Sequence, residues 1–129
     1  MRKAFDAVAD GIQKAAEQLN PGVKGWEIYA VASQQIVESG YPEYQNALGH
    51  QVGKEDHDGG TILGPRWPRY GQTPFCRVEA GNVFTLEPSI TAVGDSGCLG
   101  LEEMVLVTDT GCQWLSEPQR TLPCLGREA

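Results

Sequence analysis

The clearest pattern in the first third of the chain is a set of apolar side chains spaced three and four residues apart. Within residues 4–19 the apolar positions are Phe5, Val8, Ile12, Ala15 and Leu19. Within residues 26–38 they are Trp26, Tyr29, Ala32 or Ser33, and Ile36. This spacing predicts two amphipathic helices whose apolar faces pack into a core. We expect neither helix to carry chemistry.

Local breakers set the ends of both helices. The run Asn20-Pro21-Gly22 stops the first helix, because a proline moves the residue before it out of the helical region. Ser39-Gly40 ends the second, since glycine readily adopts the left-handed conformation that follows a helix. Residues 41–48 are mixed in character and could reach the next segment as an extended strand.

The second half of the chain changes to the patterns of strands. Residues 83–87 form one predicted strand, which Pro88 ends. Residues 99–108 and 112–115 form two limbs around the turn at 109–111. Residues 116–129 are polar and predict a loosely held tail. These patterns therefore predict a single α+β domain over residues 1–129, with two helices on one face of a curved, mainly antiparallel sheet.

Residues 61–77 are the least regular stretch, with three prolines and two glycines, so a regular element there is improbable. A loop this long in a small domain is often functional. Arg66 and Tyr70 are candidates for lining a substrate pocket. The alternative is a surface loop pinned by Trp67 and Tyr70.

Charge and composition exclude several classes of partner. The net charge of −7 argues against nucleic acid and against an anionic membrane surface, because both require clustered Lys and Arg. No apolar run is long enough to span a bilayer, and the N-terminus lacks the apolar region of a secretory signal. We therefore expect a cytoplasmic protein. Its four cysteines show no C-x-x-C spacing, so we expect free, mostly buried thiols.

The candidate chemistry centres on residues 49–58, which hold both histidines, His50 and His57. Glycines flank His50, and glycine in a strand pattern often marks a close approach of backbone or ligand. In residues 99–108 both faces are largely apolar, so Glu102 or Glu103 must lie in poor solvent. A buried carboxylate needs a basic partner, hydrogen bonds or a cation. One imidazole with strand carboxylates suits manganese, cobalt, zinc or iron.

Several motifs in order resemble the C-terminal half of the pita-bread metallopeptidases, the family of methionine aminopeptidase, Xaa-Pro aminopeptidase, prolidase and creatinase. The motifs are Gly49-His50-x-x-Gly53, His57, Phe84-Thr85-Leu86-Glu87-Pro88, and Leu101-Glu102-Glu103-x-x-Leu106-Val107-Thr108 with Gly111. Asn20-Pro21-Gly22 and Gly40-Tyr41 also fit. The resemblance covers nearly the whole chain and is closer to the Xaa-Pro branch. It implies half of a pita-bread fold.

The resemblance also implies roles for individual residues. His50, Glu87 and Glu102 match metal ligands, with Glu87 also helping to activate the attacking water and Glu102 bridging two metals. His57 matches the catalytic histidine that faces the substrate. The implied reaction is hydrolysis of an N-terminal peptide bond, with one or two divalent ions as cofactor and a peptide as substrate.

This chain departs from the family pattern in three places. Asp58-Gly59-Gly60 stands where Glu and then Pro usually follow the second histidine, and Gly81-Asn82 stands where a Gly-Met pair is usual. More seriously, the family draws two further aspartate ligands from strands that precede these helices, and this chain has no matching segment. Three ligands cannot complete a two-metal site.

Two hypotheses follow from the missing aspartates. In one, a homodimer or a separate N-terminal partner chain completes the site, and the assembly is a peptidase. In the other, the chain is an inactive half that serves as a binding or assembly module, with residues 66–70 as the contact. Enzymatic activity therefore stays open at this point.

Overall fold

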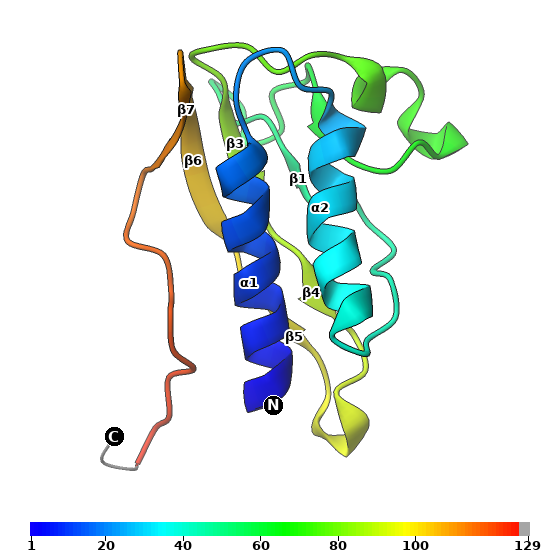
Figure 1. Cartoon of the computed structure of the whole chain (residues 1–129), viewed down its shortest axis with the longest axis vertical. Coiled ribbons are helices and arrows are strands. Elements are labelled where there is room, and N and C mark those ends of the chain that lie inside the picture. The colour runs from blue at the N-terminus through cyan, green and yellow to red at the C-terminus, as the bar shows by residue number, and fades with distance from the viewer. Residues whose placement is uncertain (127–129) are drawn as a thin grey trace.

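The computed structural model describes residues 1–126. It has two layers, one of helices and one of strands (Figure 1). Helix α1 spans Arg2–Gln18 and helix α2 spans Gly25–Glu38. The two helices pack against each other and lie on the same face of the strands. Both predicted helices are therefore present, each beginning one or two residues earlier than the pattern suggested.

The apolar stripes form the core as expected, with one exception. Phe5, Val8 and Ile12 of α1 are at most 3% exposed, and Ile28 and Ile36 of α2 are at most 1% exposed. Trp26, which the stripe of α2 placed in the core, is only half-buried and lines a surface cavity instead. The reason is its position in the first turn of α2, next to the 61–77 loop rather than over the sheet.

The main sheet is antiparallel. Strands β3 (Val83–Leu86), β6 (Glu103–Thr108) and β7 (Gly111–Trp114) are neighbours in that order. Strand β1 (Gly49–His50) pairs with β2 (Ile62–Leu63) and is joined to β3 by an antiparallel bridge between Gln51 and Phe84. The histidine segment therefore lies beside the strand that leads to Glu87.

Two strand predictions need correction. Residues 99–108 are not one limb: β5 (Leu99–Gly100) pairs with β4 (Ser89–Ile90), and β6 begins only at Glu103. The chain changes partner strand between them, which a continuous apolar pattern does not reveal. Residues 41–48 contain no strand, although Leu48 accepts a hydrogen bond from the Glu87 amide.

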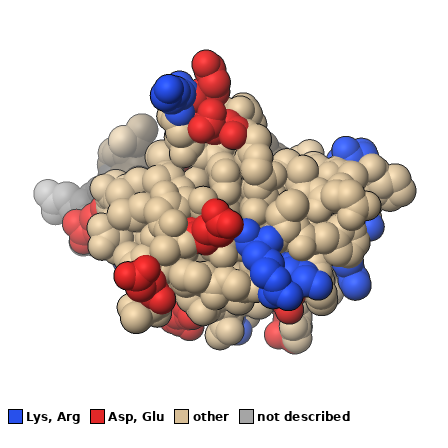
Figure 2. Space-filling view, turned by 90° about the horizontal axis from the view of Figure 1, so that it is seen from above, with Lys and Arg blue, Asp and Glu red and all other residues tan. Residues whose placement is uncertain are grey.

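The 61–77 loop is more ordered than its composition suggests. It begins with β2 and holds two short 3-10 helices, Pro68–Tyr70 and Thr73–Phe75. The loop carries three arginines and no acidic residue. It lies at the upper end of the molecule in Figure 1, and Figure 2 shows that, on this end, basic side chains gather mainly toward one side.

The cysteines and the tail also differ from expectation. All four cysteines are free, but Cys76, Cys98 and Cys124 are exposed and only Cys112 is half-buried. The exposed three lie in loops and in the tail, where no strand or helix covers them. The tail is held rather than loose over its described part, because Arg120 donates a hydrogen bond to the Gln13 side chain. Residues 127–129 lie outside the described residues.

Neither helix combines the length and the apolar character that crossing a membrane requires, within residues 1–126.

Candidate metal centre

The register of the main sheet brings two glutamates together. Val83 pairs with Leu106 and Thr85 pairs with Met104 across β3 and β6. If this register continues for two more residues, Glu87 lies opposite Glu102. Glu87 follows the end of β3, and Glu102 precedes the start of β6. Because side chains alternate along a strand, both carboxyl groups lie on the face that the helices do not cover.

His50 reaches the same face from β1. Its backbone N–H donates a 3.1 Å hydrogen bond to the Thr85 hydroxyl, which fixes β1 against β3 at this point. Its ring Nδ1 lies 3.0 Å from the Gln51 carbonyl oxygen. A carbonyl can only accept, so Nδ1 carries the hydrogen and the lone pair of a neutral ring is on Nε2. That Nε2 lies 3.7 Å from Glu87 Oε2.

The surroundings of Glu87 disfavour its negative charge. Burial raises the pKa of this carboxyl group, and the neighbouring Glu102 carboxyl raises the pKa further, while His50 and Thr85 act in the opposite direction. Two carboxylates in contact, with one of them half-buried, are an arrangement that a cation stabilises.

His57 completes the group of predicted residues. It lies in the exposed loop after β1, and its ring centroid is 4.0 Å from that of His50, at an angle of 30°. Its Nδ1 is 3.6 Å from Asp56 Oδ2, a pair that is largely exposed to solvent. The structure thus brings His50, His57, Glu87 and Glu102 to one place.

Glu103, the residue after Glu102 and the first of β6, has a different environment. Glu103 is the buried member, 6% exposed, whereas Glu102 is exposed. The Glu103 carboxylate accepts a 2.8 Å hydrogen bond from the backbone N–H of Gln119 in the tail. A backbone amide therefore compensates the buried carboxylate that the sequence indicated.

The structure does not bring Arg66 or Tyr70 to this cluster. The Arg66 guanidinium lies over the ring of Trp26, in a cavity whose lining includes none of the four clustered residues. The Tyr70 hydroxyl accepts a 2.8 Å hydrogen bond from the Ala47 amide and so anchors its loop. Their part in substrate binding stays a prediction.

Sequence reasoning missed two groups that position His50. The Thr85 hydroxyl holds its backbone and the Gln51 carbonyl orients its ring. Alternation along β3 put Thr85 on the same face as Glu87, so that signal was available. The role of a backbone carbonyl carries no sequence signal.

The donor set suits a divalent cation in its chemistry but provides only part of a site. An imidazole with a free Nε2, oriented by a backbone carbonyl, and two adjacent carboxylates are the ligands that such ions prefer. Nevertheless, within residues 1–126 no three His, Cys, Asp or Glu side chains converge closely enough to hold an ion. The described residues by themselves therefore do not form a complete metal site.

A family model identifies the class of protein to which this fold belongs. The model of the metallopeptidase family M24 matches residues 1–109. The chain belongs to this family, which confirms the resemblance seen in the motifs.

Individual relatives place the chain within the family. It is 33% identical to an Xaa-Pro dipeptidase of Pyrococcus horikoshii over 122 residues, covering 94% of this chain and 32% of the relative. It superposes on the prolidase of Pyrococcus furiosus with a TM-score of 0.76 and 29% identity, covering 91% and 32%. For an X-Pro aminopeptidase of Thermotoga maritima the TM-score is 0.77, at 28% identity, covering 92% and 31%.

These likenesses confirm the predicted fold class, half of a pita-bread fold. The chain spans about a third of the length of these relatives.

Proposed function

We propose that this chain provides one half of a metal-dependent peptidase that hydrolyses N-terminal peptide bonds at Xaa-Pro sequences. The observation that carries the proposal is that the Glu87 carboxyl group neighbours both the His50 ring and the Glu102 carboxyl group on the open face of the sheet. Membership of family M24 and likeness to proteins named Xaa-Pro dipeptidase and prolidase support the substrate class.

His50, Glu87 and Glu102 would hold manganese, cobalt, zinc or iron, one or two ions in a completed site. Such an ion lowers the pKa of a bound water and stabilises charge on the scissile carbonyl oxygen. Glu87, whose carboxylate lies beside the His50 ring, would also help to activate the attacking water. His57, exposed beside His50, would face the substrate.

The site needs further ligands from outside the described residues. A second copy of this chain, or a complementary N-terminal half, would supply them by covering the face that carries the cluster. Val83, Met104 and Leu106 on that face are only half-buried, which leaves apolar area for a partner to cover. A pair of identical chains would form a symmetric, self-complementary interface.

Native mass spectrometry with added Mn²⁺ or Co²⁺ tests the proposal, because it reports subunit number and bound ions together. We expect an assembly that carries one or two ions per site and that cleaves an Xaa-Pro dipeptide. The triple variant His50→Ala, Glu87→Gln, Glu102→Gln should lose the ions. A charge-matched control, Glu79→Gln with Asp109→Asn, removes two exposed carboxylates elsewhere and should keep them.

Undiminished metal binding by the triple variant would contradict the proposal. So would a metal-free protein with no peptidase activity, and that result would favour the alternative, an inactive half that acts as a binding or assembly module. The observation in favour of this alternative is that no three metal-binding side chains converge within residues 1–126.

A further inference from the structure

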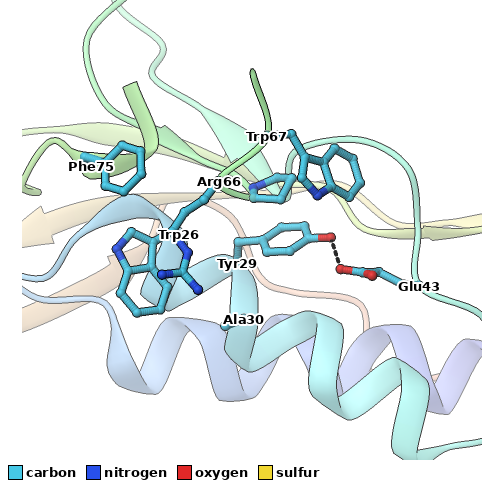
Figure 3. A pocket seen from close by; sticks show the side chains of 8 residues that line it. Trp26, Tyr29, Ala30, Glu43, Arg66, Trp67 and Phe75 are labelled. Atoms are coloured by element: carbon cyan, nitrogen blue, oxygen red, sulfur yellow. Dashed lines mark hydrogen bonds between the residues drawn. The ribbon is translucent and has the colours of Figure 1, made fainter. Parts of the chain in front are cut away.

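A second site lies on the helix side of the molecule. A cavity of about 560 Å³ opens between the first turns of α2 and the loop after β2. Four aromatic side chains, Trp26, Tyr29, Trp67 and Phe75, contribute to its walls, together with one cation and one anion, Arg66 and Glu43 (Figure 3). A mostly apolar cavity with a few polar groups is the usual form of a small-ligand site, and its volume falls within the range of about 300–1,000 Å³ typical of such sites.

The cation has no acidic partner. The Arg66 guanidinium lies 4.2 Å from the centre of the Trp26 ring, and the side chain is exposed. Within residues 1–126 no carboxylate lies within ion-pair distance of it. Stacking on Trp26 leaves the N–H groups at the edge of the guanidinium plane available, and they match the geometry of a carboxylate.

The anion lies at the other end of the cavity, beyond Tyr29 (Figure 3). Glu43 Oε1 accepts a 2.6 Å hydrogen bond from the Tyr29 hydroxyl and a 3.3 Å hydrogen bond from the Ser33 hydroxyl. Burial and the Glu43 carboxylate both raise the pKa of Tyr29, which therefore stays a donor. These bonds fix one carboxylate oxygen, and the other makes no hydrogen bond within the described part of the chain.

We propose that this cavity binds a short peptide with free termini. The C-terminal carboxylate contacts Arg66, the N-terminal ammonium contacts Glu43, and apolar side chains lie against the aromatic rings. A cation and an anion at opposite ends of an apolar cavity complement a molecule with the reverse arrangement. Short peptides have that arrangement. Each terminal charge of the peptide would contact a charged side chain, Arg66 or Glu43, that makes no ion pair with another described residue.

This site is separate from the metal centre. The cavity shares no lining residue with the cluster of His50, His57, Glu87 and Glu102. Its α2 residues belong to the helix layer, whereas the two clustered glutamates lie on the opposite face of β3 and β6. The inference goes beyond the proposed peptidase and does not depend on it, because binding at Arg66 and Glu43 requires no metal.

Isothermal titration calorimetry with defined peptides tests the inference. The probes are Leu-Phe and Leu-Ala-Phe, each also with an acetylated N-terminus or an amidated C-terminus, and free phenylalanine, all measured in EDTA so that no cleavage occurs. We expect the peptides with two free termini to bind, and either blocking group to weaken binding by about tenfold, the value of a lost charged hydrogen bond.

Variants assign each end of the peptide. Arg66→Met should weaken binding of the free peptide by about tenfold but leave the amidated peptide unaffected. Glu43→Gln should also weaken binding of the free peptide by about tenfold, because it removes the partner of the N-terminal ammonium group. It should leave binding of the acetylated peptide unaffected. Arg77→Met is the matched control, because Arg77 belongs to the same 61–77 loop but does not line the cavity, and its guanidinium donates a hydrogen bond to the Gly22 carbonyl oxygen instead.

Three results would overturn the inference: no binding of any peptide, equal binding of free and blocked peptides, or variants that bind as the wild type does. Equal affinity for free phenylalanine would assign the cavity to single amino acids instead of peptides. The triple variant of the metal cluster should bind the peptides normally, so failure of the peptidase proposal and failure of this inference are distinguishable.

Discussion

Two neighbouring tyrosines, with ring centroids 5.3 Å apart, differ in the environment of their hydroxyl groups. The Tyr29 hydroxyl donates to Glu43, whereas the Tyr44 hydroxyl is buried without a partner among the described residues. Tyr44→Phe should therefore leave the free energy of unfolding unchanged or raise it by about 1 kcal/mol, because it removes an unsatisfied polar group. Urea denaturation measures this difference.

Tyr29→Phe is the comparison for that experiment. It removes a hydroxyl that does have a partner, so the free energy of unfolding should fall by about 1 kcal/mol. A clear loss of stability in Tyr44→Phe would show that its hydroxyl is satisfied after all, for example by a buried water molecule.

The four cysteines should react at different rates. Burial raises the pKa of the Cys112 thiol, which also donates to the Ala16 carbonyl at 3.2 Å. Only the thiolate is nucleophilic, so at a given pH Cys112 has less of the reactive form than an ordinary thiol. Iodoacetamide labelling followed by peptide mass spectrometry should modify exposed Cys76, Cys98 and Cys124 well before Cys112. Equal rates in the folded protein would contradict the packing of β7 on α1.

At the scale of secondary-structure elements, the close approach of β1 to β3 requires a residue without a side chain, Gly49. A Cβ atom at Gly49 would lie 1.8 Å from the Thr85 carbonyl oxygen, so an alanine there must push the strands apart. Gly49→Ala should lower the free energy of unfolding by about 1–3 kcal/mol, the usual range for overpacking. It should also weaken metal binding in the proposed site, because His50 is the next residue.

Gly111→Ala provides the control for that substitution. A Cβ atom at Gly111 meets nothing within 4 Å, and its backbone φ is not positive. Its stability should stay within about 0.5 kcal/mol of the wild type. Equal effects of the two substitutions in thermal denaturation would show that close approach at Gly49 is unimportant.

The tail is attached to the sheet through one buried carboxylate. Glu103 accepts the Gln119 amide, and Arg120 makes a further contact with α1. Glu103→Ala removes the acceptor of that amide and so releases the tail from the sheet, and limited trypsin digestion should cleave after Arg120 faster than in the wild type. Glu103→Gln keeps an oxygen acceptor and should digest nearly as slowly as the wild type. Identical digestion of all three proteins would contradict the anchoring role.

At the scale of the whole molecule, an ion that binds the folded cluster must raise stability. Binding to the native state alone adds about 2.7 kcal/mol when the free ion is at 100 times its dissociation constant. Adding Mn²⁺ should therefore raise the Tm of the wild type but not that of the triple cluster variant. A Tm that also rises with protein concentration would indicate that the completed site is formed between two copies.

The sequence by itself determined the two helices, the strand that leads to Glu87, and the identity of the clustered residues. The spacing of apolar residues indicates which side chains lie on the same face of a helix, and alternation indicates which carboxylates lie on the same face of the sheet. Both periods can be recognised in the sequence because they are properties of the local backbone. The family motifs then identified His50 and His57, which no periodicity singles out.

Only the tertiary structure decided which neighbours these residues have. The break between β5 and β6, the choice of Glu103 rather than Glu102 as the buried carboxylate, and the hold on the tail all depend on contacts between segments far apart in the chain. The same is true of the cavity, where Trp26 in a helix meets Arg66 in a loop. Such contacts depend on where the elements lie in space, and local spacing along the chain contains no information about that.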